Sequence, residues 1–96
     1  MTHLEMIEIR TTGKNHDALE AYLANWQAEV LTVENAPQVN IYRHTALDSD
    51  FSIHLLYDAE TEQAAVQALS ERLASDLKEF GLVNQTVWVE HRYTKK

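Results

Sequence analysis

Residues 51–57, which read FSIHLLY, alternate between apolar and polar side chains in the way that is typical of a β-strand. One face of this strand would be wholly apolar or aromatic and would consist of Phe51, Ile53, Leu55 and Tyr57. The opposite face would carry His54 and Leu56, a combination that is too apolar for open water and too polar for a dry core. We therefore expect a central strand with helices on one side and a semi-polar contact on the other.

The same kind of pattern predicts five more elements around this strand. Alternation predicts strands over about 5–11, 39–45 and 85–93. Helical spacing predicts a first helix that begins at Asn15 or Asp17 and ends near Leu31. A second helix would run over about 62–80 and stop at Gly81. Their apolar stripes would be Leu19, Tyr22, Leu23, Trp26 and Val30 in the first helix, and Ala65, Val66, Leu69, Leu73, Leu77 and Phe80 in the second.

The order of these elements is strand-helix-strand-strand-helix-strand. Two right-handed crossovers of this length predict an α+β domain over residues 1–96 of the ferredoxin-like βαββαβ type. Its four-stranded antiparallel sheet would carry both helices on one face, with the first and third strands in the middle. Beside the apolar face of residues 51–57, the helices would cover Ile7, Ile9, Val87 and Val89.

The sheet face that the helices leave uncovered would carry large apolar side chains among charged ones. Left in water, these side chains would form a sizeable apolar patch, while Glu8, Arg10, Glu90 and Arg92 could pair across strands. Two such faces packed about a two-fold axis would bury about 1,600 Å². We therefore expect a homodimer in the form of a dimeric α+β barrel, with an interface made of Met6, Glu8, Arg10, Tyr42, His44, Leu56, Trp88, Glu90 and Arg92.

The composition narrows the classes of partner. Eight Lys and Arg against fifteen Asp and Glu give a formal net charge of −7, which counts against nucleic acids and anionic membranes. The chain has no cysteine, which excludes disulfides and thiol catalysis. No stretch reads as a signal peptide or membrane span, so we expect a cytoplasmic protein. Gly13 and Gly81 are the only glycines, so no phosphate-binding loop is present.

Histidines offer the first candidate chemistry. His54, in the middle of its strand, and His91 are candidate catalytic residues that would act as general acid or base. The alternative for His54 is a hydrogen-bonded residue of the dimer interface. His44 would lie beside His54 on the paired strand, and the two with Glu8 or Glu90 are an alternative set of metal ligands. Because no short ligand spacing accompanies them, we expect neither a metal nor another cofactor.

Aromatic side chains offer the second candidate site, a cleft between the helices and the sheet. Tyr22, Trp26, Tyr57 and His91 would line it, and Arg43 would lie at its edge. Such a cleft would suit a flat organic molecule; the alternative is that the aromatic side chains are ordinary core and that Arg43 extends to water. A cavity of roughly 300 Å³ or more lined by Trp26 and Tyr57 would favour a small-molecule ligand, whereas a filled core would favour an interaction module.

The segments MIEIR, NIYRH, FSIHLLYDAETE and GLVNQTVWVE together resemble the dimeric α+β-barrel superfamily and, within it, the antibiotic-biosynthesis-monooxygenase-like group. The resemblance covers nearly the whole chain through the order and character of its elements. It implies a homodimer, a ligand cleft between sheet and helices, and activities that include cofactor-free oxygenation of quinols and aromatic polyketides. The leading hypothesis is therefore a homodimer that binds a hydrophobic or aromatic small molecule, either as a cofactor-free oxygenase or as a binding protein without catalysis. The alternative is a non-catalytic interaction or regulatory module whose sheet serves assembly.

Overall fold

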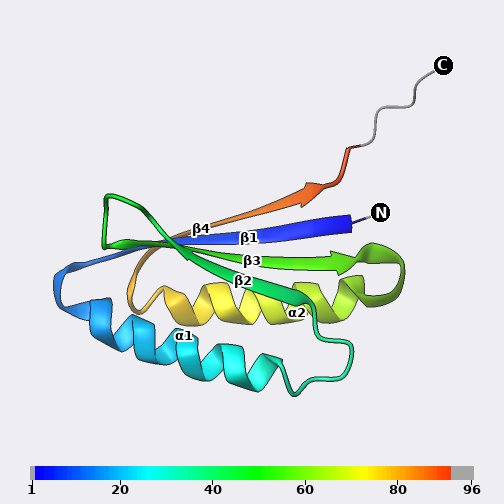
Figure 1. Cartoon of the computed structure of the whole chain (residues 1–96), viewed down its shortest axis with the longest axis horizontal. Coiled ribbons are helices and arrows are strands. Elements are labelled where there is room, and N and C mark those ends of the chain that lie inside the picture. Colours follow the sequence, from blue (N-terminus) through cyan, green and yellow to red (C-terminus); the bar gives the residue numbers. More distant parts are fainter. Residues whose placement is uncertain (1, 92–96) are drawn as a thin grey trace.

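The computed structural model describes residues 2–91, apart from the side chains of residues 59–62. Strand β1 (Thr2–Thr11) leads through the short 3-10 turn η1 (Gly13–Asn15) into helix α1 (His16–Val30). The hairpin of β2 (Gln38–Arg43) and β3 (Asp50–Asp58) is followed by helix α2 (Ala59–Leu77) and strand β4 (Gly81–Val89) (Figure 1). The strands form an antiparallel sheet in the order β2-β3-β1-β4. The predicted ferredoxin-like βαββαβ fold is therefore confirmed.

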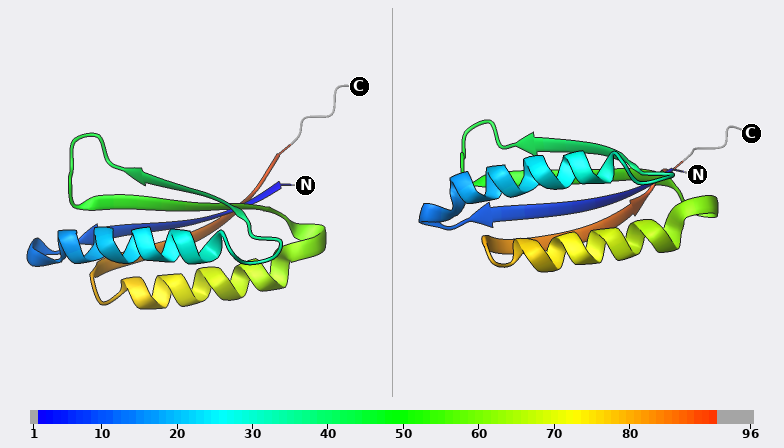
Figure 2. Two further views of the ribbon diagram at one scale, coloured as in Figure 1. Left: turned by 60° about the horizontal axis from the view of Figure 1, so that its bottom comes forward. Right: turned by 90° about the horizontal axis from the view of Figure 1, so that it is seen from below.

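Both helices cover the same face of the sheet (Figure 2). β1 and β3 lie in the middle, where their register places Ile7 opposite Ile53 and Ile9 opposite Phe51. Each side chain of these two strands that was expected to face the helices is buried. The rest of the core comes from the helices: Leu19, Leu23, Trp26 and Val30 of α1, and Val66, Leu73, Ala74 and Leu77 of α2.

The junction before α1 is fixed by hydrogen bonds to the end of the α2 segment. The side-chain amide of Asn15 donates to the backbone oxygen of Phe80 at 3.2 Å. The backbone N–H of Thr12 donates to the same oxygen at 3.3 Å. Asn15 lies at the N-terminal boundary of α1 as predicted, but its side chain joins two segments 65 residues apart instead of capping the helix.

The buried stripe of α2 differs from the predicted one at several positions. The helix ends at Leu77 and not at Phe80. Ala65 is exposed, whereas Ser70 is completely buried. Ser70 is on the covered face because the spacing from Val66 through Ser70 to Leu77 follows the helical period. Burial of its hydroxyl is tolerated because Ser70 Oγ accepts a hydrogen bond from Gln85 Nε2 at 2.6 Å.

Strand β4 begins and ends earlier than the predicted strand over 85–93. Because α2 ends early, the chain turns back sooner and pairs Gly81 with Thr11. Val87 shares the helix-covered side with its partner Glu5, yet Val87 and Val89 are each 53% exposed. Figure 1 shows this end of β4 rising away from the helices. The prediction that the helices cover Val87 and Val89 is therefore wrong.

In the described part of the chain, neither helix is long and apolar enough to cross a membrane.

Candidate functional site

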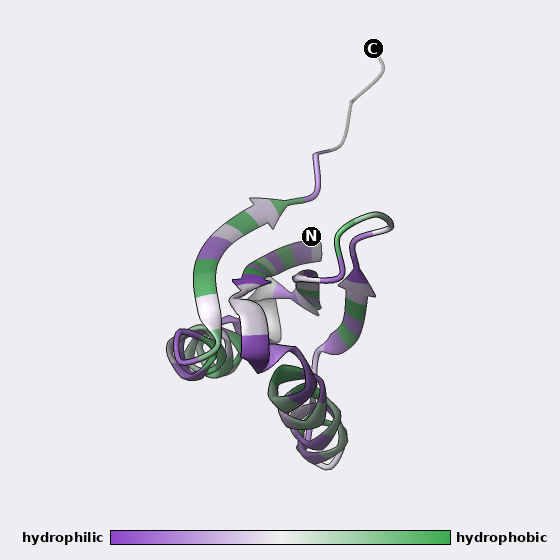
Figure 3. Cartoon of the chain, turned by 90° about the vertical axis from the view of Figure 1, so that its left-hand side faces the viewer, coloured by the Kyte–Doolittle hydropathy of each residue, from purple (hydrophilic) through white to green (hydrophobic). Residues whose placement is uncertain are grey.

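The sheet face opposite the helices carries exposed apolar side chains, as the strand parities predicted. Trp88 is 56% exposed and Tyr42 is 51% exposed, and Leu82, which was not predicted, is 73% exposed. Met6 and Leu56 lie between them and are half-buried. Figure 3 shows β2 and β4 rising on either side of the central strands, on the side away from the helices. The uncovered face is therefore concave and partly apolar.

Two residues of the predicted interface, His44 and Glu90, lie just beyond the ends of their strands. His44 is in the turn that follows β2. Glu90 follows the end of β4, where its backbone N–H donates to the oxygen of Thr2 at 2.8 Å, and Arg92 lies outside the described residues. Arg10 forms its ion pair with Asp50 of β3 and not with an acid of the predicted set, so the predicted cross-strand charge pairing at Arg10 is wrong.

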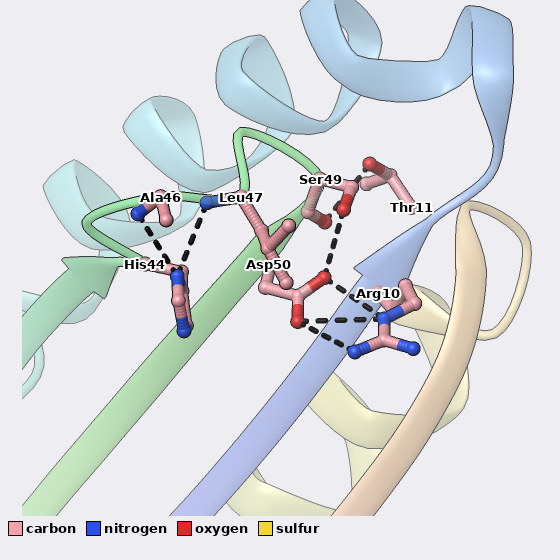
Figure 4. A network of polar contacts seen from close by, with 7 residues as sticks. All are labelled: Arg10, Thr11, His44, Ala46, Leu47, Ser49 and Asp50. Carbon is pink, nitrogen blue, oxygen red and sulfur yellow. Dashed lines mark hydrogen bonds and ion pairs between the residues drawn. The ribbon is translucent and has the colours of Figure 1, made fainter.

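A hollow of about 400 Å³ lies on the uncovered face near the turn between β2 and β3. In it the Arg10 guanidinium binds Asp50 through two atoms, with Nε 3.0 Å from Oδ1 and Nη2 3.1 Å from Oδ2 (Figure 4). The hydrogen bond from Arg10 and a second one from Ser49 hold the pKa of the Asp50 carboxyl below its usual value. Other lining residues are Tyr42, Arg43 and His44.

His44 closes the turn after β2. Its Nδ1 accepts the backbone N–H groups of Ala46 at 3.0 Å and Leu47 at 3.1 Å (Figure 4). The prediction that His44 lies beside His54 is wrong, because the register places Asn40 opposite His54, and the backbone N–H of His44 donates instead to the oxygen of Asp50 at 2.9 Å. The alternative metal set that needed both histidines is therefore not assembled.

His54 stands on the uncovered face in a polar and aromatic setting. Its Nε2 lies 2.9 Å from Ser52 Oγ, and the centre of its ring lies 4.8 Å from that of Tyr42. Met6 is its partner in β1. This position is compatible with an interface residue and with a catalytic one, and the catalytic role of His54 stays a prediction.

A groove of about 290 Å³ runs between α1 and α2. Tyr22 and Trp26, one helical turn apart, line it from α1, and Leu73 and Asp76 line it from α2. The Tyr22 hydroxyl donates to Asp76 Oδ2 at 2.9 Å. Burial and this hydrogen bond to a carboxylate raise the pKa of Tyr22 to about 12. The groove therefore has an aromatic wall and one polar end.

Replacing Asp76 by asparagine is expected to lower the pKa of Tyr22 from about 12, because the variant loses the negative charge that favours the protonated phenol. The measurement is a titration of the Tyr22 ring carbon by NMR. Glu29→Gln is the matched control and should lower the pKa less, since Glu29 acts on Tyr22 through a weaker charge interaction. An unchanged pKa in Asp76→Asn would contradict the hydrogen bond.

A second hollow of about 260 Å³ adjoins this groove and shares Val33, Leu69 and Arg72 with it. Its other walls come from the loop after α1 and from the early part of α2. The two hollows therefore adjoin along these three residues. The other walls of the second hollow include Ala36, Pro37, Ala65 and Ala68.

The structure does not assemble the predicted cleft between helices and sheet as a single site. Tyr22 and Trp26 share the groove, but Tyr57, which is 5% exposed, does not line it. The ring of Tyr57 lies 5.6 Å from that of His3. His91 follows β4 and is exposed, and Arg43 lines the hollow on the uncovered face. Tyr22 and Trp26 are thus the predicted ligand residues that the fold brings together.

Two acidic residues, Asp76 and Glu5, were not recognised from the sequence. Asp76 was hidden among the polar positions of α2, although its spacing from Leu73 places it beside the groove. Glu5 is 2% exposed on the covered face of β1. Its parity with Ile7 was the available signal, but an acid in a strand is ordinarily assumed to face water.

A cluster of possible metal ligands lies at the start of α1. One ligand atom each of His16, Asp17 and Glu20 falls within 4.8 Å of the others. His16 Nδ1 is 3.5 Å from Asp17, and its Nε2 is 3.7 Å from Glu20. Both acids are exposed, and exposed acidic groups are common without an ion. The cluster is therefore a local grouping of two exposed acids beside a half-buried histidine.

Comparison with known proteins bears on the fold. No protein-family model matches the sequence, and no curated protein sequence matches it significantly. Among solved structures, a variant of SnoaB, a cofactor-independent oxygenase from Streptomyces nogalater, is similar with a TM-score of 0.71 at 11% identity, over 99% of this chain and 98% of SnoaB.

Two further structures of proposed antibiotic biosynthesis monooxygenases are similar. The protein from Bordetella bronchiseptica has a TM-score of 0.63 at 11% identity, over 95% of this chain and 98% of its own. The protein from Chloroflexus aurantiacus has a TM-score of 0.58 at 14% identity, over 97% of this chain and 98% of its own. The chain therefore has the fold of the antibiotic biosynthesis monooxygenase structures along nearly its whole length, and the resemblance noted in the sequence is confirmed at the level of the fold.

Proposed function

We propose that this protein is a homodimer that binds a flat hydroxylated aromatic molecule, such as a quinol, in the groove between α1 and α2 and oxidises it with O₂ without a resident cofactor. The observation that carries the proposal is the groove, in which Trp26 and Tyr22 offer an aromatic wall and Asp76 a polar end. A planar molecule with a hydroxyl group needs this combination of surfaces. The choice of reaction is supported by the fold that the chain shares with SnoaB, a cofactor-independent oxygenase.

The Tyr22–Asp76 pair supplies the groups that a hydroxylated ligand would meet. Asp76 has a second carboxylate oxygen to accept the hydrogen of the ligand hydroxyl. Tyr22 is protonated at neutral pH, as any phenol is, and the rise of its pKa to about 12 keeps it protonated at alkaline pH as well. In the conversion of a quinol to a hydroxyquinone, one atom of O₂ enters the ring and the other leaves as water. The quinol supplies all the electrons, so the reaction needs no separate reductant.

Dimerisation is the second part of the proposal and concerns the opposite side of the sheet. The concave face with Trp88, Tyr42 and Leu82 leaves large apolar side chains in water in an isolated chain. A second copy of the same face would cover them about a two-fold axis. Because the groove lies on the helix side, the dimer would leave it open to ligand.

Filling the groove is the direct test. Val33→Trp is expected to weaken binding of a quinol panel about tenfold, a loss of ~1.4 kcal/mol, because Val33 is exposed and lines both the groove and the adjoining hollow. Leu31→Trp is the matched control: Leu31 is also exposed and lies two positions away, but it lines neither hollow. Binding is measured by tryptophan fluorescence of each variant and turnover by consumption of O₂.

The outcomes separate the candidate functions. O₂ consumption that is lost in Val33→Trp and kept in Leu31→Trp supports the oxygenase. Binding without O₂ consumption leaves a binding protein. Neither binding nor turnover by the unaltered protein contradicts the proposal and favours the interaction module. That alternative has support of its own, because Tyr57 and the strand residues beneath the helices form a packed core. Neither His54 nor His91 lines the groove, so His54→Gln is expected to leave binding there unchanged.

A further inference from the structure

The central strand β1 carries an acid on its helix-covered face. Glu5 is 2% exposed, and in the sheet it lies between Leu55 of β3 and Val87 of β4. It shares this face with Ile7, which is completely buried, because residues two apart in a strand point the same way. A carboxylate in such a place is costly unless it is paired with a cation or carries a proton.

The groups around Glu5 supply no permanent cation. Within the described residues, the hydroxyls of Ser70 on α2 and Tyr57 on β3 act on the Glu5 carboxyl. The charges of Glu71 on α2 and His3 on β1 act on it as well. None of these groups belongs to Lys or Arg. Burial is the largest influence and raises the pKa of Glu5, and Glu71 adds to it. Ser70, Tyr57 and His3 act in the opposite direction and only partly offset the burial. The neutral acid is therefore the favoured form.

Two polar atoms of this cluster are buried without a hydrogen-bonding partner within the described residues, namely Glu5 Oε2 and Tyr57 Oη. Glu5 and Tyr57 are close enough to act on each other's pKa, although these two atoms do not reach hydrogen-bonding geometry. The Ser70 hydroxyl does have a partner, because its Oγ accepts a hydrogen bond from Gln85 Nε2 at 2.6 Å. It still has its own hydrogen to donate. Two buried polar atoms placed like this in a folded protein are commonly bridged by an internal water molecule.

We propose that Glu5, Tyr57 and Ser70 form an internal site between the sheet and α2 that binds one proton and one water molecule. The proton is on the Glu5 carboxyl, and the water joins Glu5 Oε2 to the Tyr57 hydroxyl. Ser70 donates to the other carboxyl oxygen. This site does not depend on the proposed function, because it lies on the sheet side of α2 and shares no residue with the groove.

The proton is tested by following the side-chain carboxyl carbons of the full chain by NMR against pH. The signal that disappears in Glu5→Gln is expected to titrate above the other glutamates. Tyr57→Phe should raise its midpoint further, and Glu71→Gln should lower it, in keeping with the directions in which these groups act. Glu8→Gln is the matched control, since Glu8 is on the same strand but exposed on the opposite face. A Glu5 carboxyl that titrates with the exposed glutamates would overturn the proposal.

The water is tested in the same samples by its magnetisation transfer to neighbouring protein protons. A slowly exchanging water should be detected next to the Tyr57 ring and should be lost in Tyr57→Phe, which keeps the ring but removes the hydroxyl. Its presence in both forms, or its absence from the unaltered protein, would contradict the bridging position.

The protonation of Glu5 also affects how protein stability depends on pH, which can be measured without assigning an NMR spectrum. Because the folded-state pKa of Glu5 is raised above 4.5, the ordinary value for a glutamate, its contribution to stability is fully present below the unfolded-state pKa and is lost as the pH rises through the folded-state pKa. Glu5→Gln is therefore expected to gain stability relative to the unaltered protein as the pH rises toward neutrality, in urea unfolding at a series of pH values. A constant difference between the two proteins across this range would overturn the proposal.

Discussion

Replacing Trp88 by glutamate is expected to convert the proposed homodimer into a monomer. Trp88 is on the uncovered face, where it pairs with Leu4 and is 56% exposed in a single chain. In a face-to-face dimer the new carboxylate would be buried against apolar side chains of the second copy. Loss of a buried aromatic anchor typically costs about 2–4 kcal/mol of binding energy, which weakens association by more than about thirtyfold. The measurement is sedimentation or light scattering over a range of concentrations.

Val87→Glu is the matched control for this experiment. Val87 is the neighbour of Trp88 on the same strand, its exposure of 53% is nearly equal, and it points to the opposite face. The control should remain a dimer at concentrations where Trp88→Glu is a monomer. If both variants dissociate, or if the unaltered protein is itself a monomer at micromolar concentration, the uncovered face is not the interface.

Replacing Gly81 by alanine is expected to lower the free energy of unfolding by about 3 kcal/mol, at the upper end of what overpacking costs. A Cβ at this position would overlap the backbone oxygen of Arg10 and would lie 2.9 Å from Thr11 Cα. These are backbone atoms of the central strand, so they cannot rotate away as a flexible side chain can. The first pairs between β1 and β4 would have to separate. Urea unfolding measures the loss.

Gly13→Ala is the contrasting variant. A Cβ at Gly13 would meet no atom within 4 Å, but the residue has a φ of +40°, so alanine there suffers only backbone strain of about 1 kcal/mol. Equal losses in the two alanine variants would mean that the close approach at Gly81 is not what limits stability. Gly13→Asn should cost less than Gly13→Ala, since asparagine adopts positive φ more readily.

The sequence pattern was sufficient for the order of the strands and the faces of the two central ones, and insufficient for the bounds of β4 and the layer of helices. Strict alternation along Phe51 to Tyr57 specified which side chains face the helices, because a register error would place every apolar residue in water. The same argument failed at the end of β4, where Val87 alternates correctly but no helix reaches it. Strand parity determines the direction of a side chain, and the length of the covering helix determines whether it is buried.

The candidate sites were harder to predict for a related reason. Tyr22 and Trp26 were recognised from their spacing on one helix. Asp76, Val33 and Arg72 line the same groove because of the distance between α1 and α2. The packing of both helices on the sheet sets that distance, and no local sequence pattern encodes it. Glu5 was passed over because its type suggested exposure while its position dictated burial.

The order of the strands has a consequence for protein synthesis. Of the four strands of this sheet β1 is made first, yet it pairs on one side with β3 and on the other with β4, which is made after the other three. Asn15 donates a hydrogen bond to the backbone oxygen of Phe80. While the chain is still on the ribosome, one edge of β1 has no neighbour until residues 81–89 have emerged from the exit tunnel. A nascent chain stalled before Gly81 therefore presents an open strand edge, and we expect this sheet to be completed only after residues 81–89 have left the tunnel.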